Sequence, residues 1–377
     1  MYTETIKLDS VITDIAAGPF GSNLKVSCFV EYGFPIIDGA NLKGFKVTDN
    51  IKKYVTEEKA RSLHRSIAHR NDVVVTISGT LGQIAYIPFD SKFEEYLCSQ
   101  RQFRVTFNTD RVHVPYLVYY FHSREGQHKI LSFANQTGVP ALSQPLKNFR
   151  NIEVNLPDIN TQKRIASVLK SLDNKIELNT KINENLAQQA QAIYRSMFVS
   201  TPYESDRIGV LSELIAVKYG KDHKKLNDGI YPVYGSGGIM RYVEKPIYEK
   251  ESVLIPRKGS LNNVMYIDEP FWSVDTMFYT EMKIANVAKY VFHFLRSKDL
   301  ASLNAGSAVP SMTTDILNSM EVSIPSTERL ADFENLVAPL YRVMKDNVRQ
   351  SNNLSLLRDT LLPKLMSGDI DVSEVKI

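Results

Sequence analysis

The sequence predicts an α+β protein made of two similar mixed globules, each followed by a long helix. The first observation is an internal repeat, because residues 138–142 (GVPAL) recur at residues 307–312 as SAVPSM. The second is that a short strand-like stretch after each copy ends at Pro157 or Pro325, where a heptad-patterned helix begins. From these prolines onward the copies align without a gap at an offset of 325 − 157 = 168 residues. A duplication of this length predicts a pseudosymmetric molecule suited to a two-part target.

Length and composition restrict the class of protein. The 377 residues are enough for two or three domains with their own cores. No apolar run approaches the ~18–20 residues needed to span a bilayer, and the N-terminal stretch lacks the apolar segment of a signal peptide. The only cysteines, Cys28 and Cys98, have no metal or redox spacing, which fits a reducing compartment. We therefore expect a cytoplasmic protein that has no membrane partner.

The repeat predicts the order of four segments along the chain. Each copy consists of a globule of short strands and a few helices, and then a helix. We expect a first recognition globule at residues 1–157, a spacer helix at 158–200, a second globule at 201–325, and a second helix with a tail at 326–377.

Local patterns predict equivalent elements in the two globules. Residues 72–77 are apolar and bounded by Ser-Gly, as expected for a buried strand, and residues 251–255 match them in the second copy. Residues 101–107 alternate polar and apolar side chains, which predicts a half-buried strand. The aromatic residues 114–123 read as helical and are echoed at 290–297. The pattern of strands and helices repeats, whereas the polar residues around it differ between the two copies.

The two helices carry the spacing of a coiled-coil seam, in which apolar residues recur at alternating steps of three and four. At ~1.5 Å per residue, about 36 residues make a rod of roughly 54 Å. The predicted helix-pair packing residues are Ile165, Leu169, Leu172, Ile176, Asn179, Asn183, Leu186 and Ile193 in the first helix, and Phe333, Leu336, Leu340, Val343, Asn347, Leu354, Leu357 and Leu361 in the second.

Polar residues interrupt both seams. Asn179 and Asn347 are repeat equivalents, since 179 + 168 = 347, and Asn183 and Gln350 lie close to them in sequence. A polar seam residue lowers stability but specifies register. We expect these side chains to meet across an antiparallel pair.

Motifs for catalysis are missing. The chain has no P-loop, no dinucleotide-binding glycine fingerprint and no Gly-x-Ser-x-Gly elbow. Its seven histidines lack ligand-like spacing, so we predict no metal site. Asp158 could belong to a nuclease-like carboxylate set, but its place at a helix start favours a capping role. We predict no catalytic residues.

Charge argues against a broadly basic DNA-binding surface. Residues 1–157 carry 18 basic and 15 acidic side chains, and residues 201–325 carry 14 and 15. Contact with nucleic acid therefore has to use local clusters, or a partner that supplies further phosphate contacts.

Several polar loops contain the residue types that read DNA. Arg pairs with guanine edges, Asn and Gln pair with adenine edges, and lysines suit phosphates. Ordinary polar surface loops remain an alternative for any single residue, although the loops recur at equivalent repeat positions. The candidate DNA-contacting residues are Ser22, Asn23, Lys25, Asn41, Lys43, Thr80, Gln83, Gln100, Arg101 and Gln102 in the first globule, and Lys218, Lys221, Lys224, Lys225, Ser236, Arg257, Lys258, Ser260, Asn262 and Asn263 in the second.

The order globule, helix, globule, helix resembles the specificity (S) subunit of type I restriction-modification enzymes over essentially the whole chain. The marks that carry the resemblance are residues 18–22 (GPFGS), 78–82 (SGTLG), 138–140 (GVP), 162–166 (QKRIA) and 361–370 (LLPKLMSGDI). The second globule departs from this pattern, because it lacks a GPFGS loop and reads Arg257-Lys258-Gly259.

The resemblance implies a non-catalytic reader of double-stranded DNA. Each globule would recognise one half of a split target, and the two helices would pack antiparallel as a spacer. Two methyltransferase (M) subunits and restriction (R) subunits would be its partners. S-adenosylmethionine, ATP and Mg²⁺ would then bind to those partners, with no cofactor in this chain.

Two other classes stay open from the residues alone. One is a DNA-modifying enzyme whose catalytic residues follow no familiar motif, which labelled S-adenosylmethionine and DNA would detect. The other is a coiled-coil scaffold with two protein-binding heads, for which DNA retention that weakens with salt would be contrary evidence.

Overall fold

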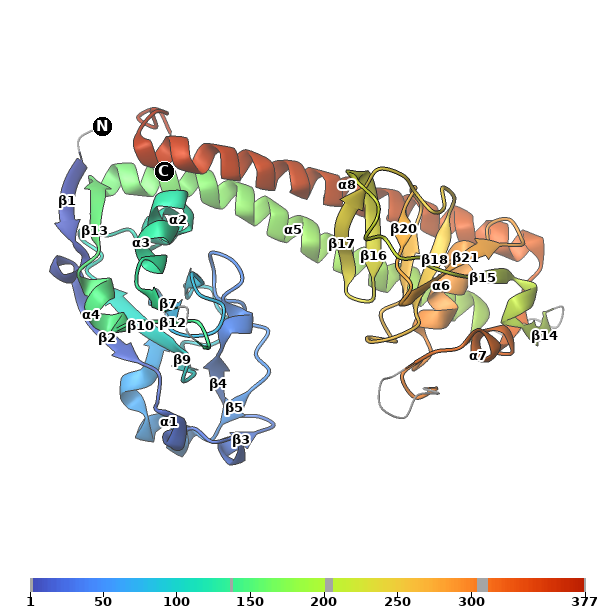
Figure 1. Cartoon of the computed structure of the whole chain (residues 1–377), viewed down its shortest axis with the longest axis horizontal. Coiled ribbons are helices and arrows are strands. Elements are labelled where there is room, and N and C mark those ends of the chain that lie inside the picture. Colours follow the sequence, from blue (N-terminus) through green and yellow to red (C-terminus); the bar gives the residue numbers. More distant parts are fainter. Residues whose placement is uncertain (1–2, 136–137, 201–205, 304–310, 376–377) are drawn as a thin grey trace. The chain divides into compact units, whose positions relative to one another are not determined.

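The computed structural model describes residues 3–135, 138–200, 206–303 and 311–375 (Figure 1). It divides into two units: unit 1 comprises residues 1–177 and 350–377, and unit 2 comprises residues 178–349. Each long helix contributes to both units, and each unit has its own core. Residues 307–310 of the repeated motif lie outside the described residues.

The centre of unit 1 is a four-stranded antiparallel sheet of order β2-β10-β7-β8. These strands are β2 (Ile12–Ala17), β10 (Gln102–Phe107), β7 (Val73–Thr76) and β8 (Ile84–Tyr86). Every residue of β7 is buried, which confirms the predicted buried strand. The half-buried prediction for β10 is wrong, because Gln102 and Arg104 are buried as well. Other chain segments cover its polar face.

The rest of unit 1 packs around this sheet. Its remaining strands are β1 (Thr3–Lys7), β3 (Phe29–Val30), β4 (Phe34–Ile37), β5 (Tyr54–Val55), β6 (Ile67–His69), β9 (Glu95–Cys98), β11 (Ala134–Asn135), β12 (Ala141–Leu142) and β13 (Glu153–Pro157). Its shorter helices are α1 (Glu57–Ser62), α2 (Val114–His122), α3 (Arg124–Leu131) and α4 (Pro145–Arg150), with 3₁₀ turns at Leu8–Ser10, Gly21–Asn23, Val26–Cys28, Gly39–Asn41 and His64–Ser66. Strands β3, β5, β4, β9 and β6 form a second sheet, in which β4 and β9 are parallel.

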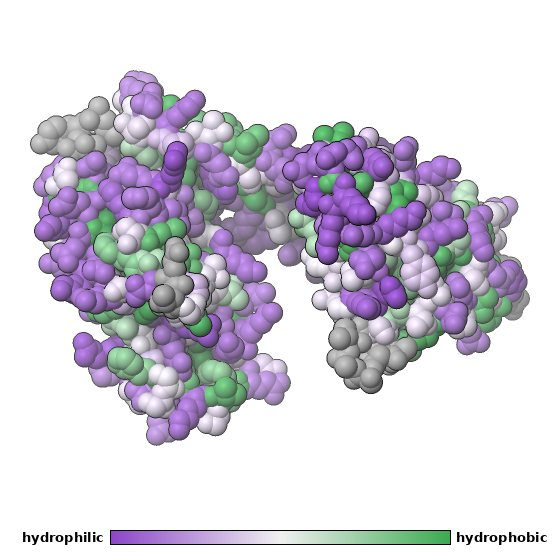
Figure 2. Space-filling view, in the orientation of Figure 1, coloured by the Kyte–Doolittle hydropathy of each residue, from purple (hydrophilic) through white to green (hydrophobic). Residues whose placement is uncertain are grey.

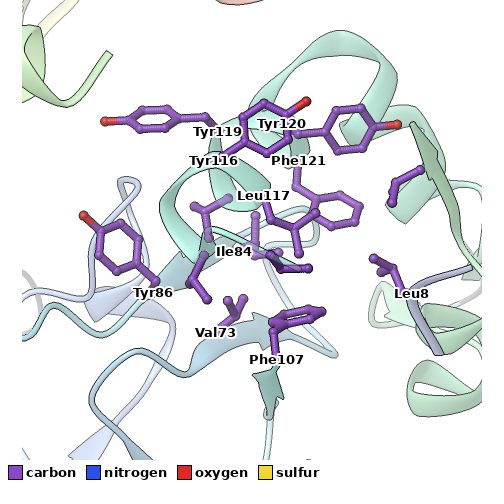
Figure 3. Close-up of a cluster of buried hydrophobic side chains, with 14 of the residues drawn as sticks. Leu8, Val73, Ile84, Tyr86, Phe107, Tyr116, Leu117, Tyr119, Tyr120 and Phe121 are labelled. Carbon is purple, nitrogen blue, oxygen red and sulfur yellow. The ribbon is translucent and has the colours of Figure 1, made fainter. Parts of the chain in front are cut away.

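Helix α2 is the centre of the unit 1 core. Its residues 114–121 are all buried, which explains why the sequence is apolar around the whole helix. One side of α2 meets Val73, Ile84 and Phe107 of the sheet, as Figure 3 shows. The same core includes Leu169 of the first long helix. The first globule is thereby packed onto that helix.

Unit 2 repeats this plan. Its sheet has the order β15-β21-β18-β19, the counterpart of β2-β10-β7-β8. Its strands are β14 (Arg207–Val210), β15 (Ile215–Tyr219), β16 (Asp228–Gly235), β17 (Gly238–Val243), β18 (Ser252–Pro256), β19 (Met265–Ile267), β20 (Trp272–Ser273), β21 (Met277–Met282) and β22 (Glu321–Ile324), and its shorter helices are α6 (Ala288–Arg296), α7 (Thr314–Asn318) and a 3₁₀ turn at Leu211–Glu213.

The register of the two sheets confirms the duplication. Phe103 faces Val75 in unit 1, and Phe278 faces Ile255 in unit 2. The loops between β7 and β8 and between β18 and β19 have the same length, since Val73 pairs with Tyr86 and Val253 with Tyr266. Residues 73–86 therefore correspond to 253–266 without a gap.

The long helices α5 (Ile159–Phe198, 40 residues) and α8 (Thr327–Ser367, 41 residues) are antiparallel. In unit 1, Asp173 of α5 pairs with Arg358 of α8 at 2.7 Å. In unit 2, farther along α5, Asn183 bonds to Met344 O, earlier in α8, at 3.0 Å. Asp158 caps α5, because its Oδ1 accepts from the backbone N–H groups of Asn160 and Thr161.

Three residues predicted in the second seam are exposed. Leu336, Val343 and Leu357 are 53%, 46% and 46% exposed. Their C-terminal neighbours point inward instead: Val337 is fully buried, and Arg358 pairs with Asp173. Because α8 has apolar residues at adjacent positions, its sequence supports two apolar stripes, and Val337 is the one that joins the unit 2 core.

The other predicted seam positions are less exposed. Ile165, Leu169, Asn179 and Phe333 are buried, and Leu172, Ile176, Asn183, Leu186, Ile193, Leu340, Asn347, Leu354 and Leu361 are partly buried. Within the described ranges, no helix combines the length and apolarity needed to cross a membrane.

Candidate nucleic-acid interface

Three loops of unit 1 meet around an open cavity of about 740 Å³. We call them the glycine loop (residues 18–25), the hairpin loop (77–83, between β7 and β8) and the strand-end loop (99–101, between β9 and β10). Leu24, Thr80, Gln83, Gln100 and Arg101 line the cavity. The loops lie at one end of the sheet, so its strands determine their spacing.

Glycines allow these loops to approach one another. The backbone N–H of Gly18 donates to Gln102 O at 2.8 Å, and a Cβ on Gly18 would lie 1.9 Å from Ser99 O. Any other residue would force the two loops apart. Gly79 has φ +100°, a left-handed conformation that favours glycine.

Four candidate DNA-contacting residues of unit 1 also make hydrogen bonds that hold the loops together. Asn41 and Gln102 are 4% and 1% exposed, so almost none of either side chain is open to a ligand in this structure, and their contact with DNA stays a prediction. Asn41 donates to the carbonyls of Thr48 and Asn50, and Gln102 accepts from Ser99. Buried amides have to satisfy such internal hydrogen bonds.

Gln83 and Gln100 use their amide nitrogens in the same way. Gln83 Nε2 donates to Gly39 O at 3.1 Å, and Gln100 Nε2 donates to Leu24 O at 2.6 Å. Each side chain therefore ties one loop to another, and its contact with a base stays a prediction beside this positioning role.

The remaining candidates of unit 1 are accessible. Arg101 and Thr80 are exposed at the cavity. Ser22, Asn23 and Lys25 are exposed on the glycine loop, whereas Lys43 is exposed outside the cavity lining. Accessible hydroxyl and cationic donors are the groups that contact phosphates and base edges.

Unit 2 places a different loop on the same framework. The N–H of Gly220 donates to Met277 O at 3.1 Å, and a Cβ there would lie 2.1 Å from Val274 O. Gly220 is thus the counterpart of Gly18, but the loop after it is basic. Its candidates Lys221, Lys224 and Lys225 are exposed, and Lys218 on β15 pairs with Glu281 at 3.6 Å.

Two asparagine candidates of unit 2 are also positioning residues. Asn263 Nδ2 donates to Ser236 O at 2.8 Å, the contact that Gln83 makes with Gly39 in unit 1. Asn262 donates to Asp299 at 2.9 Å and accepts from the N–H of Ala301. Both residues are exposed, so their contacts with bases stay predictions beside this positioning role.

The accessible donors of unit 2 lie beside these asparagines. Lys258 and Ser260 are exposed, and Gly259 between them has φ +86°, as Gly79 does in unit 1. The Arg257 guanidinium lies 5.4 Å from the Tyr219 ring centroid, and its Nη1 donates to Asp275 O at 3.2 Å. These contacts orient a cation at the loop.

Apolar residues at the same loops were missed from the sequence. Phe20 is 82% exposed on the glycine loop, and Ile239 and Met240 are exposed after the turn that ends β16. Figure 2 shows hydrophilic residues over most of the visible face of each unit, with hydrophobic residues in separate spots. A large apolar residue beside a glycine turn was the available signal.

Both sites offer hydrogen-bond donors suited to binding a ligand. These are guanidinium, ammonium and hydroxyl groups on loops at the end of a sheet. Within the described part of the chain, no three His, Cys, Asp or Glu side chains gather as a metal site.

Comparisons with known proteins agree with this interpretation. The model of the type I restriction modification DNA specificity domain matches residues 21–188 and 202–332. The MjaIX specificity subunit of Methanocaldococcus jannaschii is 21% identical over 367 residues, covering 86% of this chain and 83% of the relative. The HindI specificity subunit of Haemophilus influenzae is 21% identical, covering 77% and 84%.

A solved structure shares the fold. The type I restriction-modification S subunit from M. genitalium has a TM-score of 0.60 at 18% identity and covers 97% of this chain and 96% of that chain. The two family matches together span most of the sequence. The chain therefore belongs to the type I restriction-modification DNA specificity family, as the non-catalytic subunit that determines DNA specificity while partner subunits bind the cofactors.

Proposed function

We propose that each globule reads one half of a bipartite duplex DNA target. The observation that carries the proposal is the repeated three-loop site: Gly18 and Gly220 hold equivalent places on equivalent sheets, yet different side chains come after them. A shared frame with different donors is suited to reading two unlike half-sites. Residues 1–157 and 201–325 would be the recognition domains, and 158–200 and 326–377 the spacer segments.

The duplication also suggests the assembly. A pseudosymmetric specificity subunit presents two similar surfaces, which fits two methyltransferase subunits, one for each half, with restriction subunits joining that core. The exposed apolar side chains of Leu336, Val343 and Leu357 on α8 offer area for such protein contacts. Because the substrate is DNA inside the cell, we place the complex in the cytoplasm.

Exchange of one globule tests the modular proposal. Residues 207–325 are replaced by the corresponding segment of a relative, and the methylated motif is sequenced from cells that express the complex. We expect one half of the motif to change while the other half is retained. A change in both halves, or in neither, would contradict the proposal.

A further inference from the structure

One pair of opposed residues, just beyond the last paired residues of the sheet, is equivalent in the two units and lies at the candidate interface. We call this pair the rung. In unit 1, the N–H of Ile77 donates to Arg101 O at 2.6 Å. In unit 2, the N–H of Arg257 donates to Thr276 O at 2.9 Å. The pairs next along each ladder, Gln102 with Thr76 and Met277 with Pro256, show the same register.

Each unit therefore has one arginine on this rung, but on opposite strands. Arg257 corresponds to Ile77, and Arg101 corresponds to Thr276. Directly opposed residues of an antiparallel pair have Cβ atoms about 5 Å apart, so a long side chain from either strand reaches the same space.

The backbone around the rung is the same in both units. Gly79 and Gly259 come two residues after it, and both have positive φ, at +100° and +86°. The intervening Ser78 forms an isolated bridge with Ala141, and Lys258 does so with Ser311. The two hairpin loops thus leave the rung in the same direction.

The two guanidinium groups are available for an external acceptor. Within the described ranges, Arg101 makes no side-chain hydrogen bond or ion pair, and its Nη1 lies 3.8 Å from where a Cβ on Gly79 would be. Arg257 is held by the Tyr219 ring and by Asp275 O, and it has no carboxylate partner among the described residues. Neither charge is neutralised internally.

We propose that this rung is a shared guanine-reading position: Arg101 reads a guanine in one half-site and Arg257 reads a guanine in the other. Guanine presents O6 and N7 acceptors in the major groove, which match two N–H donors of one guanidinium. The inference rests on the proposed function and names its specificity determinants. If it is correct, an arginine at either of the two opposed positions of the rung should recognise the guanine.

The test moves the arginine of unit 2 to the strand that unit 1 uses. Arg257→Ile copies Ile77, and adding Thr276→Arg copies Arg101. Each variant is assembled with the methyltransferase subunits and given a DNA library, and the methylated sequences are read. We expect Arg257→Ile to relax one guanine position by about 10- to 100-fold and the double variant to recover it. The half-site read by unit 1 stays unchanged.

Controls separate this inference from the proposed function and from misfolding. Arg207→Ile removes an exposed arginine of unit 2 away from the loops and should leave the motif intact. If Arg257→Ile does not assemble, Arg257→Lys is used instead. It keeps the charge and the aliphatic chain but lacks the two parallel N–H donors of the guanidinium, so it should relax discrimination at the same base.

Three outcomes would overturn the inference. They are unchanged discrimination in Arg257→Ile, a uniform loss over all sequences, and no recovery in the double variant. If the wild-type motif does not depend on this chain, the proposed function itself fails.

Discussion

In both units the globule contacts the helix pair at an equivalent position, which we call the junction. The groups that form it are charged in unit 1 and neutral in unit 2. In unit 1, Tyr119 of α2 donates to Asp173 of α5, which also pairs with Arg358 of α8. In unit 2, His293 of α6 bonds to Tyr341 of α8 at 3.0 Å and to Gln191 of α5 at 2.7 Å. The helix offset makes Asp173 and Tyr341 equivalents, since 173 + 168 = 341.

The comparison indicates that the position of the junction is common to the two units, whereas the charge of its side chains is not. Unit 1 uses a largely buried ion pair, with the Arg358 guanidinium 4.9 Å from the Phe45 ring centroid. In unit 2 burial, with the nearby Arg296 and Lys289, lowers the pKa of His293 to about 3, so the ring is neutral. The two junctions should therefore respond differently to mutation and to pH.

The largest expected effect is in unit 1. Asp173→Ala removes the acceptor of Tyr119 and leaves Arg358 with only the exposed Asp359 as a carboxylate partner, which should destabilise unit 1 by about 3 kcal/mol. Asp173→Leu combined with Arg358→Leu should cost less, because no buried charge is left. Hydrogen exchange at α2 and α6 amides measures each junction separately. Equal acceleration in both helices would contradict independent junctions.

Tyr341→Phe is the matched change in unit 2. It removes one neutral hydrogen bond to His293, for which we expect a loss of about 1–2 kcal/mol confined to α6. A loss as large as that of Asp173→Ala would show that the neutral junction is no more tolerant than the charged one.

Acid should weaken unit 2 through His293. The folded-state pKa lies below the ordinary value of 6.5, so the unfolded state takes up a proton first and stability falls as pH drops from about 6.5 towards 3. Between pH 7 and pH 5 the loss should be about 2 kcal/mol. His293→Phe should remove it at α6. The dependence should persist in unit 1, where burial lowers the pKa of His113 to about 4.

The seam asparagines should have a smaller effect of opposite sign. Asn179 bonds to Asn347 O, and Asn347 donates to Asn183 Oδ1 at 2.9 Å. Asn179→Leu with Asn347→Leu should raise stability by about 1 kcal/mol and loosen the register. The readouts are thermal unfolding and the spacer of the methylated motif. A sharp, unchanged spacer would leave register to the other seam residues.

The smallest change in stability is expected from lengthening both helices together. Asn183 faces Met344, so by the same antiparallel register the boundary between Glu177 and Leu178 lies across from the boundary between Arg349 and Gln350. Four residues inserted at each boundary add ~6 Å and turn the next segment by ~40°. Both junctions keep their contacts, and at ~3.4 Å per base step the spacer should grow by about one or two base pairs. An unchanged spacer with full activity would mean that the helices do not set it.

Periodic features were predictable from sequence because neighbours along the chain determine them. The buried strand at Val73–Thr76, the helices α2, α5 and α8, and the capping role of Asp158 were all readable from local pattern. The seam was predictable only in part, since Leu336 and Val337 are both apolar and only the packing of the unit 2 core decides that Val337 is the buried one.

The candidate site was also predictable only in part. Residue types and loop positions were readable, but the hydrogen bonds from Gln83 to Gly39 O and from Asn263 to Ser236 O were not. An amide has the same donors whether it faces DNA or a carbonyl, and only distant segments determine which one it meets.

Order along the chain was enough to establish the duplication, the two long helices and the recognition class, because repeats and periodicity are properties of that order. The folded structure was needed to show that Arg101 and Arg257 share a rung from opposite strands, and that Tyr119 and His293 make equivalent junctions. These pairings depend on strand register and helix packing, which bring together residues that no local pattern connects.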